Sequence, residues 1–585
     1  MTCHVTRSGY SIWAAEDEAD PAGLRRLRNR LSHVVLLKWE ETGEEHKLKL
    51  YDIQPDSSGR LAWAAVEEAF GADLVEISDE GTPGLLQVGD RAGLTIDTFQ
   101  PGDTILVNVS RKAQAQTAAE VASGYFGKNK YGVLGLAPSS AASFENYNEL
   151  QKLRINAPFF LSGRPASAKA PPLALVHEVF GEFLTDADSI QPSPDTFDFV
   201  LEACAMLADF YADEKIRQQL FNRLLGRFLG KDIYSVSLTE GVSATGGSIV
   251  DSLDKPEFAS LHVEYKEDMS TGTASDPSAE IMSYHYCLLN RMAPKSRLAS
   301  SPCFGVVVIG CMLWICGLAF VGKLAFQPLT PMFPMLDLRP GQPAYMEQLA
   351  RAFEALRHGV TRLGKEYAAS PLGVRPAHFV PYPLTNSARW LEVQHLVNID
   401  SLLFFARDAQ TETAKVIKYV TKYSTEVHQA LSDTGLAPVL YDTVQLKGGF
   451  MQVEMELLAE EDGWTRLDMM SAEELSRVQP AVLAALDRVH ALRLPDGGSV
   501  VLADCRPCNV MVRIVDGGLV DVRFIDFDWA GRAGVVRYPC FMNHRDVPWP
   551  DGVKEFEHAL QIHDTRLLTR HLPKMSTAAT DGWLS

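Results

Sequence analysis

Residues 501–531 read VLADCRPCNVMVRIVDGGLVDVRFIDFDWAG, and this stretch decides the fold of the last third of the chain. Two apolar runs flank Asp516-Gly517-Gly518, a sequence typical of a hairpin turn between two strands. Such a hairpin brings Asn509, at the start of the first strand, close to Asp526, at the end of the second. Asp504 precedes Asn509 by five residues, so the stretch predicts three oxygen-bearing side chains near one end of the hairpin.

Side chains of this kind suit phosphoryl transfer. That chemistry needs an acceptor near the incoming hydroxyl group and oxygen ligands for the Mg²⁺ that binds the nucleotide phosphates. A catalytic loop of the form HRDxxxxN supplies both. We therefore expect Asp504 to act as the catalytic carboxylate and Asn509 and Asp526 to bind Mg²⁺. Arg506 is expected to neutralise charge near the transferred phosphoryl group.

Two further motifs upstream fit an ATP site. In AKVIKYV (414–420), Lys418 stands in the VxK context of a small-lobe strand, where a lysine pairs with nucleotide phosphates. Glu426, in the next helical stretch, is its candidate partner. GGFMQVEMELL (448–458) resembles a hinge strand, which would place Glu456 near the adenine edge. The stretch after it, SAEELSRVQPAVLAALDRVHAL, predicts a capped helix that leads into the catalytic loop.

Residues 391–565 resemble the protein-kinase-like and aminoglycoside-phosphotransferase-like modules of basidiomycete fungal proteins. In those modules a loop H-G-D-L-R-P-x-N precedes an IDFDWAG strand and a RYP…LN…WP segment. This chain has ADCRPCN, IDFDWAG, RYPCFMN and VPWPDGV in the same order. The resemblance implies a bilobal fold and an ATP- and Mg²⁺-dependent phosphotransferase that acts on Ser or Thr of a protein substrate.

The chain also departs from that pattern. Leu502 and Ala503 stand where the loop has histidine and glycine, and LLFFARDAQ stands where a Gly-rich phosphate loop would precede Lys418. The alternative is therefore a catalytically impaired pseudokinase that binds nucleotide or serves as a scaffold.

A second constellation lies in the middle of the chain. SLHVEYKED (260–268) contains Glu264-x-Lys266 at the end of a predicted strand. Metal-dependent nucleases of the PD-(D/E)xK type combine this carboxylate and lysine with an upstream acidic residue, for which Asp251 and Asp254 are the candidates. The simpler interpretation is a salt bridge at an exposed strand end.

Fungal Crinkler-type proteins resemble this layout of a ubiquitin-like header, a restriction-endonuclease-like domain and a kinase-like domain. The resemblance implies an effector or toxin in which nucleic acid is bound, if at all, through the nuclease-like part. It also aligns Gly246 with an aspartate of the family, which leaves the nuclease metal site incomplete.

An uncharged run from Cys303 to Gly322, CFGVVVIGCMLWICGLAFVG, has the length of a membrane-spanning helix. Its glycines and β-branched residues favour a different structure, namely two buried strands joined by a turn near Gly310. We expect the strands and no membrane association, with the helix as the alternative.

These motifs predict a multidomain α+β protein with a C-terminal bilobal protein-kinase-like fold. Strands are expected at HVVLLKW, HKLKLYDI and DTILVNV in the N-terminal part, and a helix over 61–71. Further helices are expected over 197–229, with an apolar stripe that includes Phe210, and over 344–368, with a stripe formed by Leu349, Phe353, Leu356, Val360 and Leu363. The expected parts are a loosely ordered N-terminus (1–30), a small β-grasp or ubiquitin-like domain (31–112), a restriction-endonuclease-like PD-(D/E)xK α/β domain (113–343), a helix with a proline-rich linker (344–390) and the kinase-like domain (391–585).

Composition limits the partners. The net charge of −19 argues against a general polyanion binder, so any nucleic-acid contact would need a local basic groove. The nine cysteines are odd in number and form no regular framework, which predicts reduced thiols in a reducing compartment. No secretory signal opens the chain, and we expect an intracellular location, cytoplasmic or nuclear.

Overall fold

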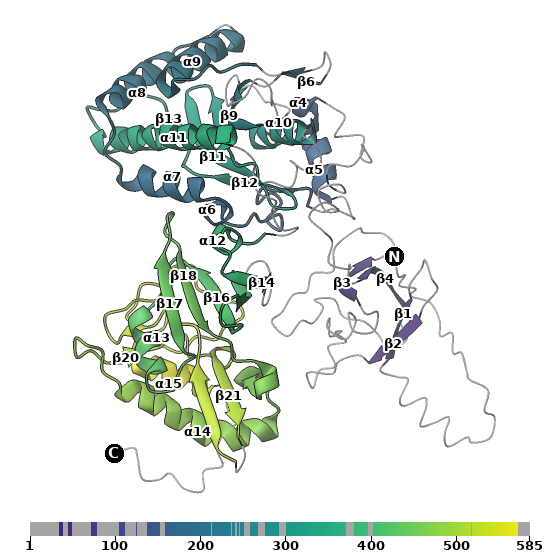
Figure 1. The fold of residues 1–585 in the computed structure, drawn as a ribbon, viewed down its shortest axis with the longest axis vertical. Coiled ribbons are helices and arrows are strands. Elements are labelled where there is room, and N and C mark those ends of the chain that lie inside the picture. The colour runs from purple at the N-terminus through teal and green to yellow at the C-terminus, as the bar shows by residue number, and fades with distance from the viewer. Residues whose placement is uncertain are drawn as a thin grey trace, which may run out of the picture. The chain divides into compact units, whose positions relative to one another are not determined.

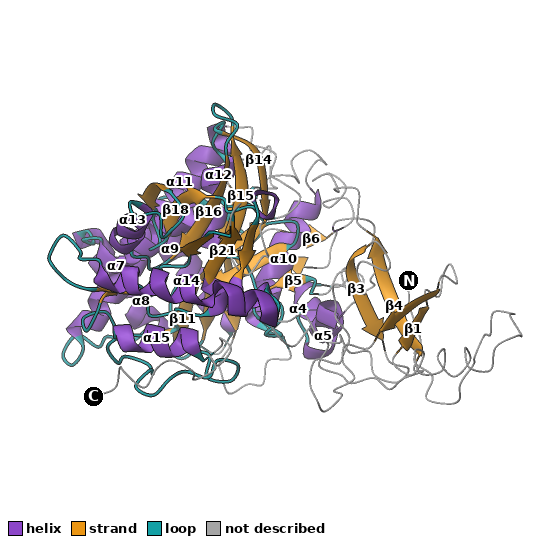
Figure 2. Ribbon diagram, turned by 90° about the horizontal axis from the view of Figure 1, so that it is seen from below, coloured by secondary structure: helices purple, strands orange, loops and turns teal. Residues whose placement is uncertain are grey.

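The computed structural model describes most of residues 137–570 and a few strands before them. The described ranges are 137–152, 158–211, 213–235, 237–239, 243–244, 246–250, 258–266, 275–291, 300–369, 379–395, 402–515 and 518–570, with Tyr125 and four N-terminal strands. The chain divides into two compact units, Met1–Thr117 and Ala118–Ser585. It is a mixed α+β protein with several sheets, and Figure 2 distinguishes its helices from its strands.

The first unit contains a four-stranded sheet of order β2-β1-β4-β3. Its strands are β1 (Val34–Lys38), β2 (Glu45–Lys49), β3 (Ala72–Ser78) and β4 (Thr104–Arg111). β1 runs antiparallel to β2 and parallel to β4. Strands were expected at three of these places, while the helix expected over 61–71 lies outside the described residues. The β-grasp assignment stays a prediction.

The middle of the chain is built on one large sheet, with path β5-β12-β11-β10-β9-β8 and β13 paired to β11 (Figure 1). The strands are β5 (Phe160–Leu161), β8 (Gly247–Val250), β9 (Ala259–Lys266), β10 (Cys303–Ile309), β11 (Met312–Phe320), β12 (Leu324–Pro328) and β13 (Phe333–Pro334). A small hairpin pairs β6 (Ser237–Thr239) with β7 (Ser243–Ala244). β9 and β10 are parallel, and β10 and β11 antiparallel.

Helices cover both faces of this sheet, because its strands are apolar on both sides. One face packs against α6 (Leu173–Val176), α7 (Glu178–Ser189), α8 (Pro194–Leu207), α9 (Glu214–Leu229) and α11 (Pro343–Ala369). The other face packs against α4 (Pro138–Ala141), α5 (Phe144–Lys152) and α10 (Pro277–Arg291). Successive residues of β9 therefore point to opposite faces of the sheet. Leu261, Val263 and Tyr265 pack in the core on the side of α7, α8, α9 and α11.

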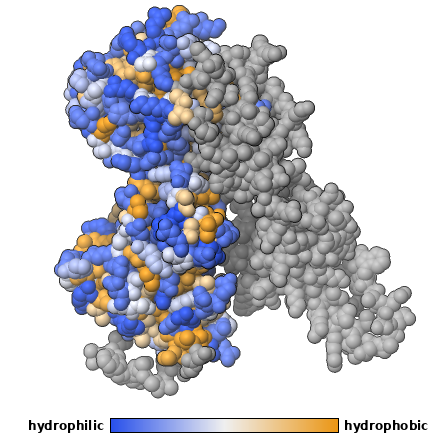
Figure 3. Space-filling view, in the orientation of Figure 1, coloured by the Kyte–Doolittle hydropathy of each residue, from blue (hydrophilic) through white to orange (hydrophobic). Residues whose placement is uncertain are grey.

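The uncharged run from Cys303 to Gly322 forms the strand pair β10–β11, as predicted. Gly310, in the turn, has a φ of 55°, which a glycine adopts without strain. Most of the run is buried, and hydrophilic residues cover much of the described surface in Figure 3. Among the described residues, no helix combines the length and apolarity that crossing a membrane requires.

The helix expected over 197–229 is two helices. α8 ends at Leu207 and α9 begins after Asp213, whose side chain accepts a hydrogen bond from the backbone N–H of Lys215. This N-cap starts a new helix axis. Phe210 lies in the connection and is 98% exposed, so its place in the predicted apolar stripe was wrong.

The helix expected over 344–368 is confirmed as α11. The predicted stripe of α11 is buried against the middle sheet, as shown by Leu349, Phe353, Leu356, Val360 and Leu363. Because the stripe completes that core, α11 belongs structurally with the preceding sheet.

The C-terminal part begins with α12 (Tyr382–Thr385) and a five-stranded sheet of order β14-β15-β16-β18-β17. Its strands are β14 (Trp390–His395), β15 (Leu403–Asp408), β16 (Ala414–Val420), β17 (Leu440–Gln445) and β18 (Met451–Glu456), with α13 (Thr425–Ser432) after β16. α14 (Ala472–Ala491) follows and carries the predicted capping box, in which Ser471 and Glu474 bond reciprocally.

Short sheets and one helix complete this part. β21 (Val510–Ile514) lies between β19 (Trp464–Arg466) and β22 (Val520–Phe524), and β20 (Val500–Val501) pairs with β23 (Gly531–Arg532). α15 (Gln561–Thr569) is the last described helix. Single 3₁₀ turns, η4 (Glu460–Asp462), η5 (Leu467–Met469) and η6 (Pro507–Asn509), connect the elements.

Candidate functional site

The hairpin predicted from 510–524 is present, and it sets the position of the site. β21 and β22 are antiparallel, with Val510 opposite Phe524. One residue beyond this pair, the backbone N–H of Ile525 donates to the carbonyl oxygen of Asn509 over 2.9 Å. The register therefore holds Asn509 next to the residue that precedes Asp526, as the sequence predicted.

Lys418 of β16 reaches the end of this hairpin from another sheet. Its Nζ lies 2.9 Å from Oδ1 of Asp526 and 2.6 Å from Oδ1 of Asp528. Burial disfavours the charge on Lys418, but the two carboxylates outweigh burial and raise its pKa. For Asp528, burial and then repulsion by Asp526 raise the pKa to about 7. The sequence predicted Lys418 and Asp526 in one site but missed Asp528.

The loop between β20 and η6 carries the predicted catalytic carboxylate. Both oxygens of Asp504 accept hydrogen bonds of 2.5 Å from the guanidinium of Arg506. Asn509 donates its side-chain N–H to the carbonyl oxygen of Asp504 over 2.9 Å, so its amide oxygen is oriented away from that carbonyl. Arg506 also lies over the Trp549 ring, 5.7 Å from its centroid. In this arrangement Arg506 neutralises Asp504, whereas the sequence suggested a role toward a phosphoryl group.

Asp564, which sequence reasoning missed, anchors this loop. It is fully buried on α15 and accepts hydrogen bonds of 2.8 Å from the backbone N–H groups of both Leu502 and Ala503. His490 of α14 lies 3.2 Å from the same carboxylate. The sequence does contain a sign of this role. In IHDTRLL, Asp564 lies on the same helix face as Leu568, which is buried. A carboxylate on a buried face needs hydrogen-bond partners, because an unpartnered buried charge is costly.

Two residues near the site have left-handed backbone conformations. Ala503 has a φ of 64° and Asp526 a φ of 70°. Such conformations cost a non-glycine residue about 1–3 kcal/mol and persist where surrounding structure holds them. The hydrogen bond from Ala503 to Asp564 provides this restraint in the loop. Glycine would adopt this φ at position 503 without that cost.

Glu426 and Glu456 occupy other positions than the sequence suggested. Glu426 is exposed in the first turn of α13, and the carboxylates at Lys418 are instead Asp526 and Asp528. The predicted pairing of Glu426 with Lys418 is therefore wrong. Glu426 is near Lys418 in sequence, but the β21–β22 hairpin brings Asp526 and Asp528 into contact with the lysine. Glu456, at the end of β18, pairs with Arg523 and accepts from the backbone N–H of Val439. Its role at an adenine edge stays a prediction.

Glu264 and Lys266 of the middle sheet lie together with two residues of α10. Lys266 Nζ is 2.9 Å from Glu264 Oε1 and 2.5 Å from Glu280 Oε2. Tyr284 donates to Glu264 over 2.6 Å and to Glu280 over 3.1 Å. Glu264 is 3% exposed, so the alternative of a salt bridge at an exposed strand end was wrong about exposure. Burial and then the nearby Glu280 raise the pKa of Glu264 to about 8.

The upstream carboxylate of a nuclease site is not supplied here by a described residue. Asp251 and Asp254 lie outside the described part of the chain. Gly246, which the resemblance aligns with an aspartate, is tightly enclosed: a Cβ built on it would lie 2.6 Å from the carbonyl oxygen of Val263. An aspartate at this position would require the backbone to move.

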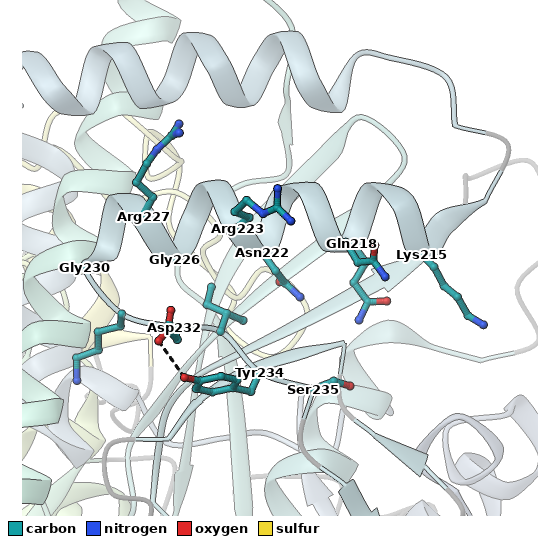
Figure 4. Close-up of a pocket in the computed structure, with 13 residues that line it drawn as sticks. Lys215, Gln218, Asn222, Arg223, Gly226, Arg227, Gly230, Asp232, Tyr234 and Ser235 are labelled. Carbon is teal, nitrogen blue, oxygen red and sulfur yellow. Dashed lines mark hydrogen bonds between the residues drawn. The ribbon is translucent and has the colours of Figure 1, made fainter.

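A groove of about 890 Å³ lies along α9 and the segment after it (Figure 4). Asn222 and Tyr234 line it, and the Tyr234 hydroxyl donates to Asp232 over 2.9 Å. Figure 4 shows the guanidinium groups of Arg223 and Arg227 pointing away from Asp232 and Tyr234. Four basic residues line the groove, Lys215, Arg223, Arg227 and Lys231, together with one acidic residue, Asp232. The nucleic-acid partner stays a prediction.

Comparisons with known proteins find similarity among solved structures. No protein-family model matches the sequence, and no curated protein matches it. Among solved structures, the chain is similar to the kinase PK-1 of the Cydia pomonella granulovirus at 14% identity and a TM-score of 0.20. The match covers 24% of this chain and 53% of the viral kinase, so it spans about half the length of that protein.

Proposed function

We propose that the C-terminal part of this chain is an ATP- and Mg²⁺-dependent phosphotransferase that acts on a serine or threonine of a protein. One observation carries the proposal: Lys418 of β16, Asp526 after β22, and the loop that carries Asp504 and Asn509 meet around the end of one hairpin. A structural salt bridge alone would explain Lys418 and Asp526. It would not explain why the loop carrying Asp504 and Asn509 is anchored beside them.

The donor set suits Mg²⁺, which prefers carboxylate and amide oxygens. Lys418 engages Oδ1 of Asp526, and Asn509 uses its N–H to bind Asp504. The Asn509 amide oxygen accepts only a weak hydrogen bond, from the Cys508 thiol over 3.6 Å, which an ion would replace. Asn509 and Asp526 would hold it, and the ion would neutralise phosphate charge when nucleotide is bound. Lys418 would then exchange a carboxylate for a phosphate oxygen.

Asp504 would orient the acceptor hydroxyl group and accept its proton. As it stands, both carboxylate oxygens of Asp504 bind Arg506. Acceptor binding therefore requires at least one of these hydrogen bonds to be replaced. Arg506 would move toward the incoming phosphoryl group in the same step, which is the role that the sequence suggested for it.

The test is phosphate transfer from labelled ATP by the full chain, with a general protein acceptor and with the chain itself. Asp504→Asn and Asp526→Asn are each expected to lower the transfer rate by at least about 100-fold, because each removes a group that acts in the transition state. Asp521→Asn is the matched control, since this half-exposed aspartate of β22 pairs with Arg513 outside the site. Transfer that survives both substitutions would sink the proposal.

A nucleotide-binding pseudokinase is the second candidate function. The double hydrogen bond between Arg506 and Asp504 favours it, and so does the lack of any glycine between Trp390 and Thr413, where a phosphate loop would lie. A thermal-shift titration with ATP, with and without Mg²⁺, distinguishes the two. Mg²⁺-dependent stabilisation without transfer indicates the pseudokinase, and no stabilisation at all argues against both.

A further inference from the structure

Two histidines meet between β9 and α10, beside the Glu264–Lys266 cluster, where the ring centroids of His262 and Tyr284 lie 6.5 Å apart. His262 of β9 and His285 of α10 are each at most 1% exposed, and their ring nitrogens Nε2 and Nδ1 lie 3.2 Å apart. Cys303, at the start of the neighbouring strand β10, is also fully buried and is not in a disulfide. One ligand atom from each of the three residues lies within 4.8 Å of the others.

The other nitrogen of each ring also has a hydrogen-bond partner, which indicates which ring nitrogen carries the hydrogen. His285 Nε2 lies 3.0 Å from the carbonyl oxygen of Ser301, which can only accept, so this nitrogen carries the hydrogen. His285 Nδ1 therefore presents its lone pair toward His262. His262 Nδ1 lies 2.9 Å from the hydroxyl oxygen of Ser248, which can donate or accept. His262 can thus carry its hydrogen on either nitrogen at little cost.

Each imidazole can carry its hydrogen on the nitrogen that faces a serine oxygen and leave its other nitrogen available to an ion. Neutral imidazole is the form that binds metal ions. Ligating histidines usually donate their other N–H to a carbonyl or hydroxyl group, and Ser301 and Ser248 stand in those positions.

We propose that His262, His285 and Cys303 supply three of the four ligands of a buried tetrahedral site for a transition-metal ion, with Zn²⁺ as the occupant. Two nitrogens bound to one tetrahedral Zn²⁺ at about 2.0–2.1 Å lie about 3.3 Å apart, close to the 3.2 Å between these rings. The set of two imidazoles and one thiolate suits zinc, while hard ions such as Mg²⁺ prefer oxygen.

Binding an ion requires the Cys303 thiol to leave its present acceptor, the carbonyl oxygen of Phe304 at 3.2 Å, and the hydrogen bond between the two rings to open. The hydrogen of His262 moves from Nε2 to Nδ1, where Ser248 accepts it, and the Cys303 thiol releases one proton as it becomes a thiolate. The ion would then join β9, β10 and α10, which are far apart in sequence. Its role is therefore to stabilise the middle sheet, independently of any phosphotransferase activity.

The test begins with the full-length chain, purified without affinity metals, stripped with a chelator and titrated with ZnCl₂ or CoCl₂. We expect one equivalent of zinc by elemental analysis, a rise in the unfolding temperature, and a thiolate-to-cobalt charge-transfer absorption with Co²⁺. A stripped wild-type chain that shows neither the rise nor the absorption would overturn the proposal, because Ser248, His262, His285 and Ser301 would then form a metal-free hydrogen-bonded chain.

Variants identify the ligands. Cys303→Ser is expected to abolish the charge-transfer absorption, and His285→Gln to weaken Zn²⁺ binding by at least about 100-fold, more than loss of an outer partner would. Cys316→Ser is the matched control, because Cys316 is equally buried in the same core. Cys508→Ser is a second control, because Cys505 and Cys508 form a CxxC sequence that could bind the added metal elsewhere. If the absorption persists in Cys303→Ser or disappears in either control, the assignment is wrong.

Discussion

Lys418 and Asp526 are 108 residues apart in sequence, yet Nζ of the lysine lies 2.9 Å from Oδ1 of the aspartate. The lysine comes from the five-stranded sheet and the aspartate from the end of the β21–β22 hairpin. Asp528 completes the group, so one ammonium stands against two carboxylates. The two carboxylates therefore depend on Lys418 for charge neutralisation, and a bound cation or a substitution of Lys418 would change this balance directly.

Replacing Lys418 by methionine is expected to destabilise the C-terminal part by about 1–3 kcal/mol. The substitution leaves two neighbouring carboxylates without their cation, and the partial exposure of both reduces the cost below that of a fully buried pair. The unfolding midpoint in urea measures the effect. Adding Asp528→Asn should recover part of the loss, and Lys422→Met, at a nearby exposed position, should have little effect. Equal midpoints for Lys418→Met and the wild type would contradict this account.

Asp564→Asn is expected to reduce transfer while leaving ATP binding nearly unchanged. The asparagine cannot accept the N–H groups of both Leu502 and Ala503, so the loop that carries Asp504 loses its anchor. Asp564 is a positioning residue, and the informative readout is the split between kcat and the ATP dissociation constant. Asp487→Asn, at an exposed position of α14, is the control. A parallel loss of ATP affinity would point to general unfolding of the site.

His428 predicts a loss of stability in mild acid. Its ring is fully buried, stacks on Phe527, and lies 2.9 Å from the carbonyl oxygen of Pro438. Burial lowers its folded pKa to about 4. The unfolded chain, with an ordinary pKa of about 6.5, therefore binds the proton first as the pH falls. This contribution to stability is complete above about pH 6.5 and decreases toward pH 4, by up to about 3 kcal/mol.

Unfolding midpoints measured from pH 7 to pH 4 check this prediction. His428→Gln should show a shallower decline than the wild type, whereas His544→Gln, at an exposed position, should follow the wild type. A wild-type decline that His428→Gln does not alter would assign the acid sensitivity to other groups.

Gly246→Ala is expected to destabilise the middle sheet by about 1–3 kcal/mol, because the new methyl group would lie 2.6 Å from the carbonyl oxygen of Val263. Gly341→Ala provides a matched control, since the space around that glycine is open. Thermal unfolding distinguishes them. If Gly246→Ala were as stable as Gly341→Ala, the steric account of position 246 would be wrong.

Local features of the chain could be predicted from the sequence because they depend on neighbouring residues. Turn chemistry predicted the hairpin that holds Asn509 beside Asp526. The Ser471 capping box predicted the start of α14, and glycine together with β-branched residues predicted the strand pair between Cys303 and Phe320. The candidate residues Asp504, Asn509, Asp526 and Lys418 followed from motif order.

Only the tertiary structure decided which distant groups meet. Glu426 was the nearest acidic candidate for Lys418 in sequence, but sheet packing gives the lysine to Asp526 and Asp528. Asp564 anchors a loop about 60 residues before it, and no spacing rule connects the two. His262, His285 and Cys303 likewise meet because one face of β9 and the start of β10 pack against α10. A sequence sets local backbone preferences, whereas the burial and pairing of charged groups depend on the packing of complete layers.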